Sequence, residues 1–351
     1  MISLFKVSMA DDAAARVADV LASGYIGQGE QVERFEAALQ QLLGTPAPPL
    51  TVNSCTSAID LALHLIGLRP GDEVITTPVT CTATNSPIVT RGATPVWADV
   101  DPLTGLIDPA DVARKLTPRT RAIVAVDWGG ALCDYAALKK WSVPVIQDAA
   151  HSLTAGIGGD YVCWSFQAIK HLTTGDGGAL WCPAYDLERA RLLRWYGLDR
   201  RSKADFRCEQ NIQEAGYKYH MNDIAASIGL ANLPHVENLI GAHQFNAAEY
   251  NCRLNGAPGV VLPPWSDASS WWLYTLLVED RAAFIAHLAE RGVASSPVHA
   301  RNDTHAAFHF PNGPLPGVDV FASRNVAIPV GWWLSAADRR QIIEAVRAWT
   351  G

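Results

Sequence analysis

The sequence predicts an α/β protein with a large domain built on a mostly parallel sheet and a smaller C-terminal α/β domain. Between residues 50 and about 185, short apolar runs rich in β-branched residues alternate with helix-like stretches, as in βαβ units. The chain of 351 residues is also longer than one compact core usually fills. Because the alternation weakens after residue 235, we expect a large domain with an N-terminal arm over residues 1–235 and a small domain over 236–351.

The individual elements follow from hydrophobic periodicity and from breaker residues. A flexible loop is expected at residues 24–29, and a helix at 32–42, where apolar side chains recur at helical spacing before Gly44. A proline-rich stretch precedes residues 273–278, which predict a strand of the small domain. The strands predicted for the large domain are short and bounded by breakers: 73–76, 95–97, 122–126, 144–147, 162–165 and 178–181.

Composition narrows the class of protein and of partner. No run of about 18 apolar residues occurs, so a membrane span is not expected. The net charge of −7 gives no broad basic surface, which makes nucleic acid a poor main partner. Residues 1–7 lack the apolar core and cleavage site of a secretory signal, so we expect a cytoplasmic location.

The cysteines are odd in number and scattered, and none forms a Cys-x-x-Cys pair. This pattern predicts neither a disulfide framework nor a structural zinc site, and we expect no metal. Most of the cysteines are predicted to be small buried hydrophobic residues. The seven are Cys55, Cys81, Cys133, Cys163, Cys182, Cys208 and Cys252.

Small hydroxyl residues open a predicted helix directly after Val52. Ser54, Thr56 and Ser57 precede apolar residues that recur at helical spacing up to Leu65. Free N–H groups at a helix start suit a phosphate group. Ser and Thr caps without a ligand are common, however, and this segment alone favours a plain cap.

A carboxylate ends the predicted strand at 144–147. Asp148 follows this strand, and His151 lies three residues later. An ionised carboxylate at a buried strand end needs a partner, which the protonated nitrogen of a pyridine ring would supply. An aspartate that caps the next helix is an equally good interpretation of this segment alone.

Lys170 follows the predicted strand at 162–165 and precedes a turn rich in glycine and threonine. Lysine forms a Schiff base with an aldehyde cofactor when its amine can be neutral, and burial lowers the lysine pKa. Most lysines are solvated surface charges, but Lys170 stands between Phe166, Ile169 and Leu172.

Aromatic and basic residues at 216–220 run into a predicted helix with small residues on one face. Its ordinary interpretation is a helix start that packs against a neighbour.

Together these segments resemble the DegT/DnrJ/EryC1/StrS sugar aminotransferases within fold type I of the pyridoxal-phosphate enzymes. The resemblance runs over nearly the whole chain and implies a mostly parallel seven-stranded sheet in the large domain. Each motif is weak alone, but the ordered set is specific. The matching motifs are at residues 23–29 with 35–36, 71–75, 92–96, 147–151, 165–166 with 170, and 175–178.

The resemblance implies a role for several residues. Lys170 would carry pyridoxal phosphate and move a proton between the cofactor and the substrate carbon. Asp148 would pair with the pyridinium nitrogen, and His151 would lie near the phenolic oxygen. The phosphate would be bound by Thr56 and Ser57, chiefly through backbone N–H groups, and by the Ser165 hydroxyl.

The resemblance also implies partners and substrates. Members of the family are typically dimers in which the segment matching residues 216–219 completes the active site of the other subunit, so a homodimer is implied. L-Glutamate or L-glutamine would be the amino donor and a nucleotide-linked keto-sugar the acceptor. Such reactions make perosamine-like amino-deoxy-sugars for surface polysaccharides or glycosylated metabolites.

The chain departs from the family at several positions. Cys55 stands where a glycine is usual, and Cys81 where an aromatic residue commonly stacks on the cofactor ring. Lys218 and His220 stand where Asn and Arg are frequent, and Lys218 is a candidate phosphate contact, although a solvated Lys218 and a helix-capping His220 are as reasonable. The other candidate substrate residues are Tyr217, Tyr219, His299 and Arg301.

Three alternative functions remain open from the sequence. The acceptor could be a cyclitol ketone instead of a keto-sugar. A related dehydratase carries a histidine in place of the lysine, and His171 adjoins Lys170. A non-catalytic sensor of the same fold would have lost Lys170 or Asp148, and both are present.

Overall fold

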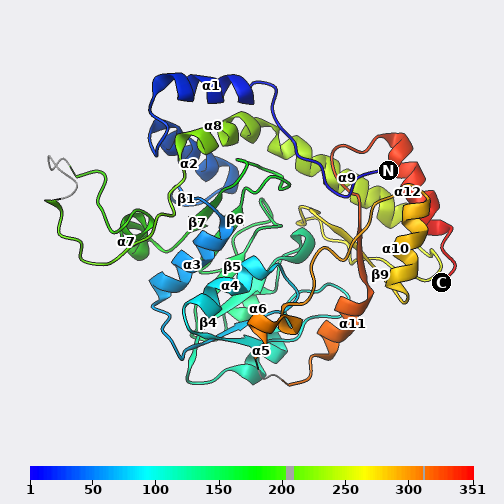
Figure 1. The fold of residues 1–351 in the computed structure, drawn as a ribbon. Helices are drawn as coiled ribbons and strands as arrows, with labels where there is room; N and C mark the ends of the chain where they lie inside the picture. Colours follow the sequence, from blue (N-terminus) through cyan, green and yellow to red (C-terminus); the bar gives the residue numbers. More distant parts are fainter. Residues whose placement is uncertain (203–208, 311–312) are drawn as a thin grey trace.

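The structure, a computed structural model, describes residues 1–202, 209–310 and 313–351 (Figure 1). The helices up to residue 235 are α1 (Ala13–Ser23), α2 (Glu30–Leu43), α3 (Cys55–Ile66), α4 (Thr82–Thr90), α5 (Pro109–Lys115), α6 (Tyr135–Leu138), α7 (Ala184–Arg194) and α8 (Asp223–Asn232). The strands of this part are β1 (Leu50–Val52), β2 (Glu73–Thr76), β3 (Thr94–Trp97), β4 (Thr120–Val126), β5 (Val145–Asp148), β6 (Tyr161–Ser165) and β7 (Gly178–Trp181). The remaining elements are α9 (Val236–Arg253), β8 (Val260–Val261), β9 (Tyr274–Val278), α10 (Arg281–Glu290), α11 (Pro316–Arg324), β10 (Asn325–Ile328) and α12 (Ala336–Arg347).

The larger sheet has seven strands in the order β1-β7-β6-β5-β4-β2-β3. The strands from β6 to β3 are mutually parallel, whereas β7 is antiparallel to both β6 and β1. The predicted mostly parallel sheet is therefore confirmed, with β7 as the one reversed strand.

The predicted elements are present with small shifts at their ends. All six strands predicted for the large domain lie within two residues of their expected bounds, and the helix expected at 32–42 is α2. Gly44 ends α2 in the left-handed conformation (φ 63°), which glycine adopts without a steric penalty. Strands β1, β8 and β10 were not predicted; they have two to four residues each and are defined by their pairing with β7 and β9.

Helices cover both faces of the larger sheet. Adjacent residues of β6 point to opposite faces: Cys163 packs in a cluster with Ile59 of α3, and Trp164 in one with Phe35 of α2. Both clusters are buried, and the second also contains Ala226 of α8. A sheet buried on both faces explains why its strands read as continuous apolar runs rather than alternating ones.

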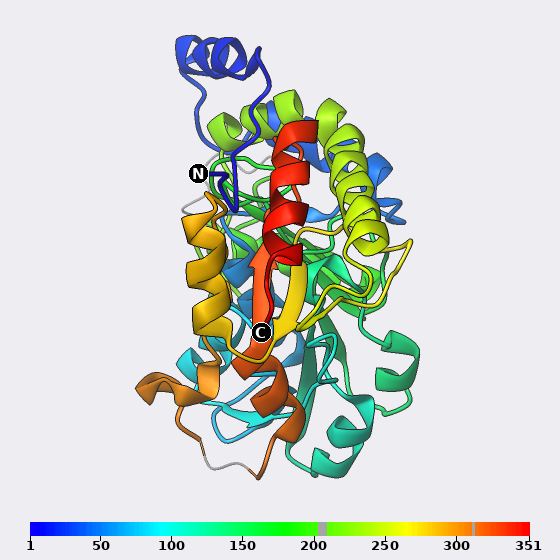
Figure 2. The same cartoon turned by 90° about the vertical axis from the view of Figure 1, so that its right-hand side faces the viewer.

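The smaller sheet is antiparallel, in the order β10-β9-β8. Tyr250 of α9, Phe284 of α10 and Ile342 of α12 are fully buried against this sheet. Figure 2 shows α9, α10 and α12 standing in front of it.

Helix α9 contacts the cores of both sheets. Val236 and Ile240 near its start belong to the cluster of α2 and α8, whereas Ala247 and Tyr250 belong to the cluster of the smaller sheet. The predicted domain boundary at residue 235 lies at the start of this helix and stays a prediction.

The N-terminal segment links the two parts of the molecule. Ile2 forms a β-bridge with Val293, and the ring of Phe5 stacks on Trp272 with 5.2 Å between centroids. The Ala10 N–H then donates to Asn232 Oδ1 of α8 at 2.8 Å. Helix α1 follows and lies along α8, apart from both sheets (Figure 1).

Among the described residues, no helix combines the length and the apolar character needed to cross a bilayer. Their six cysteines are free, and their histidine, cysteine and carboxylate side chains form no group of three placed to hold a metal ion. Cys133, Cys163 and Cys182 are buried as predicted, Cys55 and Cys81 are partly buried, and Cys252 is exposed. Cys208 lies outside the described residues.

Gly178, at the start of β7, packs closely against the start of α3. A Cβ there would lie 2.6 Å from Cys55 N and 2.7 Å from Trp164 O, both backbone atoms. We predict that Gly178→Ala lowers the free energy of unfolding by about 1 to 3 kcal/mol, measured by chemical denaturation. Gly241→Ala is the control, because Gly241 lies on the exposed face of α9 with open space around it. Alanine favours a helix more than glycine does, so this substitution should raise the free energy of unfolding by about 0.5 to 1 kcal/mol. Equal effects of the two substitutions would contradict this account.

Candidate active site

Polar residues from several strands meet at one edge of the larger sheet. Strands β1, β2, β4, β5 and β6 run in the same direction, so the loops that follow them emerge together. The segment after β1 opens α3, β5 ends at Asp148, and β6 ends at Ser165 just before the turn that carries Lys170. Three of the four segments singled out in the sequence are thus brought to a common edge.

Lys170 lies in a tight turn, where its N–H donates to the Gln167 carbonyl at 2.9 Å. Its Nζ is 3.4 Å from the centroid of a Trp272 ring. Burial lowers the pKa of Lys170 to about 7, against an opposing influence of Asp148, Cys55 and Cys81. A large fraction of the amine is therefore neutral near pH 7 and able to act as a nucleophile.

His171 packs against a different neighbour from Lys170. Its ring lies 4.5 Å from that of His243 at 77°, and burial, His243 and Lys170 keep its pKa well below the usual value. Lys170 interacts electrostatically with the Asp148 carboxylate.

Asp148 is buried at the end of β5 and receives several hydrogen bonds. Thr84 Oγ1 donates to its Oδ2 at 2.7 Å, and the Ala150 N–H donates to its Oδ1 at 3.1 Å. The Cys55 thiol lies 3.8 Å from Oδ1. Burial raises the pKa of Asp148, while Thr84, Ala150 and Lys170 oppose the rise. This carboxylate is held in place to face a cation or a protonated ring nitrogen.

His151 is a buried neutral imidazole. Burial and the nearby Lys170 keep its pKa well below the usual value. Its Nδ1 accepts from the Gly129 N–H at 3.3 Å, which leaves Nε2 as the protonated nitrogen of the ring. The ring stacks on Trp272 with 4.0 Å between centroids and an interplanar angle of 25°.

His299 enters the same region from the C-terminal part of the chain. Its ring is nearly parallel to that of His151, with 6.1 Å between centroids, and burial lowers its pKa to about 4. The preceding residue, Val298, has φ 68°, a conformation that is costly for a β-branched side chain. Just before this segment, Ser296 forms an isolated antiparallel bridge with Ala327.

The start of α3 forms the cradle expected for an anion. Ser54 caps the helix by accepting from the Ser57 N–H at 3.1 Å, and the Ser57 Oγ donates to Asn53 Oδ1 at 2.6 Å. Helix geometry leaves the N–H groups of Cys55 and Thr56 without an intrahelical acceptor. Gly178 stands beside this turn with no side chain, opposite Ser165 of β6. Ser165 Oγ accepts only a long bond, 3.4 Å, from the Gln167 N–H.

Cys81 caps α4 without a side-chain hydrogen bond and lies close enough to influence Lys170. Its loop is fastened by Asn302, which is fully buried. Asn302 donates from Nδ2 to the Thr80 carbonyl at 2.8 Å and accepts from Asn85 Nδ2 at 2.8 Å. The polar segment at 298–303 therefore lies against the loop before α4.

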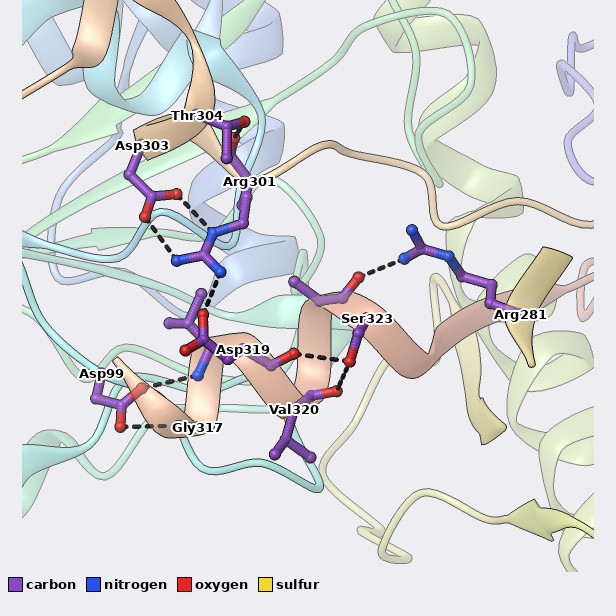
Figure 3. Close-up of polar contacts among 11 residues, drawn as sticks. Asp99, Arg281, Arg301, Asp303, Thr304, Gly317, Asp319, Val320 and Ser323 are labelled. Carbon is purple, nitrogen blue, oxygen red and sulfur yellow. Dashed lines mark hydrogen bonds and ion pairs between the residues drawn. The ribbon is translucent and has the colours of Figure 1, made fainter. Parts of the chain in front are cut away.

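Arg301 is paired with carboxylates. Its guanidinium forms a two-pronged ion pair with Asp303, at 2.8 and 2.6 Å, and a second ion pair with Asp319 of α11 (Figure 3). Asp99 in turn accepts from the Gly317 and Val318 N–H groups at the start of α11. Arg301 therefore holds α11 to this loop, and its predicted contact with substrate stays a prediction.

The segment at 216–220 lies beside β1, where His220 bridges to Val52, and the hydroxyls of Tyr217 and Tyr219 bond to other residues of the same chain. Tyr217 receives a hydrogen bond from Arg91 at 2.9 Å and contacts His64 Nδ1 at 2.6 Å. The Tyr219 hydroxyl donates to Asp60 Oδ2 at 2.9 Å. Lys218 between them is exposed.

His220 packs on Trp195 with 3.5 Å between ring centroids, and its pKa is lowered to about 4, chiefly by burial. The predicted contacts of residues 217–220 with the cofactor or substrate of a partner subunit stay predictions.

Two residues of this site were missed in the sequence. Trp272 is more than one hundred positions from Lys170, and a second tryptophan beside it gave no sign of which one faces the site. Thr84 lies one helical turn after Thr80, and the two hydroxyls are 2.8 Å apart. The Thr-x-Thr-x-Thr pattern at 80–84 was a usable signal for this polar chain toward Asp148.

Comparison with known proteins gives the family of this chain. The chain matches the DegT/DnrJ/EryC1/StrS aminotransferase family over residues 7–347. It is 32% identical over 360 residues to the spore coat polysaccharide biosynthesis protein SpsC of Bacillus subtilis (strain 168), covering 94% of this chain and 92% of that protein. It is 30% identical to the dTDP-4-dehydro-2,3,6-trideoxy-D-glucose 4-aminotransferase of Saccharopolyspora spinosa, covering 98% and 95%.

Solved structures agree with the sequence relatives. The sugar aminotransferase CalS13 from Micromonospora echinospora has a TM-score of 0.94 at 39% identity and covers 99% of this chain and 100% of its own. A putative sugar aminotransferase from Streptococcus pneumoniae, Spr1654, is known in PLP and PMP forms with TM-scores of 0.90 and 0.91 at 26% identity, covering 99% of this chain and 97% and 98% of theirs. The chain belongs to the DegT/DnrJ/EryC1/StrS aminotransferase family of pyridoxal-phosphate-dependent enzymes.

Proposed function

We propose that this sugar aminotransferase moves an amino group from L-glutamate or L-glutamine to a nucleotide-linked keto-sugar. The observation that carries the chemistry is a lysine amine with a pKa near 7 beside a buried carboxylate, at the edge of the sheet where ligands bind. The acceptor class is supported by the Saccharopolyspora spinosa relative, whose name specifies a dTDP-linked keto-sugar.

The residues at the sheet edge fit pyridoxal phosphate. Asp148 is a buried carboxylate that would hold a proton on the ring nitrogen, and the neutral His151 would donate from Nε2 toward the phenolic oxygen. The N–H groups at the start of α3 and the Ser165 hydroxyl would bind the phosphate. Cys81 would lie where relatives place an aromatic ring, so the ring would have a thiol in place of a stacking partner.

When bound, the cofactor supplies an electron-withdrawing ring that stabilises negative charge on the substrate carbon. The Lys170 amine moves the proton to and from that carbon, which requires an amine that changes charge near the working pH. A pKa of about 7 meets this requirement, whereas the ordinary lysine value would keep the amine charged. The depressed pKa of His299 keeps a second positive charge out of the same region.

The assembly is proposed to be a homodimer with shared active sites. Tyr25 is 84% exposed and Ile26 is 47% exposed, although both belong to a loop anchored to α8 through Gly29 and Asp223. Exposed apolar residues on an anchored loop favour a protein contact. Lys218 would reach the phosphate of the partner subunit. We also propose the cytoplasm as its location and a domain boundary near residue 235.

The first prediction concerns Lys170 itself. With Lys170→Ala, the visible absorbance of the lysine-linked cofactor should be lost and each half-reaction should slow by about 10²-fold or more, because carrier and base are removed together. The half-reactions are followed by cofactor absorbance as glutamate or glutamine, and then a nucleotide keto-sugar, is added. Lys139→Ala, at an ion pair with Asp160 far from the site, is the matched control. Turnover by Lys170→Ala at the control rate would exclude the proposed chemistry.

The second prediction concerns the hydrogen bond from Thr84 to Asp148. Since this bond lowers the pKa of Asp148, Thr84→Val should raise that pKa. The carboxylate must be ionised to hold the ring proton, so the acidic limb of the kcat profile should move to higher pH, by about one unit. Ser86→Ala, at a partly exposed position of α4 whose hydroxyl bonds to the Thr82 carbonyl, should leave the profile unchanged. An unshifted acidic limb in Thr84→Val would rule out this role.

The third prediction concerns the shared site. Lys218→Ala should weaken cofactor binding. When this variant is mixed with Lys170→Ala, mixed dimers should form, and one of their two sites should combine the intact Lys170 of one subunit with the intact Lys218 of the other. At a pyridoxal phosphate concentration that leaves Lys218→Ala largely empty, the mixture should regain activity that neither variant shows alone. Mass spectrometry confirms that mixed dimers have formed. If these dimers regain no activity, Lys218 contacts the site of its own chain or no site.

A further inference from the structure

Trp272 comes from the segment before β9, yet it touches two site residues that lie after β5 and β6. It is 4% exposed, and one of its rings lies 3.4 Å from Lys170 Nζ. Its Nε1 donates to the Ile169 carbonyl at 3.1 Å, so the indole is also bonded to the backbone next to Lys170. His151 stacks on it at 4.0 Å between centroids.

We propose that Trp272 is a positioning residue for Lys170: the indole face holds the amine, in its charged and uncharged forms, whenever the amine is not linked to the cofactor. This inference rests on Lys170 as the cofactor lysine. It adds a residue from the C-terminal part of the chain to a site otherwise built from the larger sheet.

The backbone around Trp272 is shaped for this task. Trp271 has φ 48°, a conformation that residues with a Cβ rarely adopt. This turn sends two consecutive indoles to different partners: Trp271 stacks on Trp265 at 5.1 Å, and Trp272 stacks on His151. Strain kept beside a functional group points to a conformation that is fixed by its surroundings.

The N-terminal arm holds Trp272 from a further direction. Phe5 stacks on it with 5.2 Å between centroids and 22° between planes. With its Nε1 bonded and two rings stacked on it, the indole has little freedom to rotate. A fixed aromatic face can keep a flexible lysine in one place, and the face attracts the ammonium form electrostatically.

The surroundings of Lys170 influence its pKa in opposite directions. Asp148, Cys55 and Cys81 favour its protonated form, whereas burial opposes it. His151 and His299 are neutral, because burial lowers the pKa of both. The indole face therefore adds to the small set of groups that keep this buried amine able to take up a proton.

The test measures capture of added pyridoxal phosphate by full-length protein freed of cofactor, followed by visible absorbance between pH 6 and 9. The variants are Trp272→Phe, which keeps a ring, and Trp272→Leu, which does not. Trp141→Leu is the matched control, since Trp141 is 37% exposed at the opposite end of β5. The cofactor has the same ionisations in every sample, so differences between variants report on the protein. Thermal unfolding identifies any variant that fails to fold.

Trp272→Leu should lower the pH midpoint of capture by up to about one unit, because the ring no longer favours the ammonium form. The limiting rate at high pH should fall about tenfold, because the neutral amine is no longer held. Trp272→Phe should restore both values to near those of the native protein and of Trp141→Leu.

An unchanged midpoint and limiting rate in Trp272→Leu would overturn the proposal, as would equal losses in the Phe and Leu variants. Lys170→Ala run alongside keeps the two hypotheses apart. If it still captures the cofactor, the proposed function fails; if it does not, the behaviour of the Trp272 variants tests this inference alone.

Discussion

A partly buried lysine amine and a buried aspartate carboxylate lie at the same edge of a sheet, and the charged form of each is disfavoured there. Burial lowers the pKa of Lys170 to about 7 and raises that of Asp148. Each influences the other, and hydrogen bonds from Thr84 and Ala150 offset part of the penalty at Asp148. A ligand that brings a basic ring nitrogen and an aldehyde would satisfy both groups together.

The fold places Lys170 and Asp148 near each other by bringing the ends of parallel strands to one edge of the sheet. Parallel strands put Asp148 and Ser165 at one edge, and the reversed β7 places Gly178 beside the start of α3. The C-terminal part of the chain adds three residues to this edge of the sheet. Trp272 lies beside Lys170, and His299 lies beside His151. Asn302 holds the loop before α4 by a hydrogen bond to the Thr80 carbonyl. The N-terminal arm joins these parts through Phe5.

Sequence reasoning was most successful where local pattern determines structure. The buried strands and α2 were predicted from periodicity, and so was the position of Asp148 and Lys170 at or after strand ends, whereas their roles stay proposals. Contacts between distant segments left no local pattern: nothing in the residues around Trp272 indicates that it meets Lys170. The bonds of the Tyr217 and Tyr219 hydroxyls to Arg91 and Asp60 could not be predicted for the same reason, and the role of these tyrosines in a partner's site stays a prediction. Strands such as β1 and β10 are too short for periodicity and exist because a neighbour pairs with them.

The central claim is that one particular amine carries the cofactor. The most direct measurement is borohydride reduction of the native protein with pyridoxal phosphate, followed by peptide mass spectrometry to locate the modified lysine. When the cofactor is not in excess, we expect one reduced cofactor per chain, attached to Lys170, and none on the surface lysines of the protein. Label spread over several lysines, or concentrated on another such as Lys218, would contradict it.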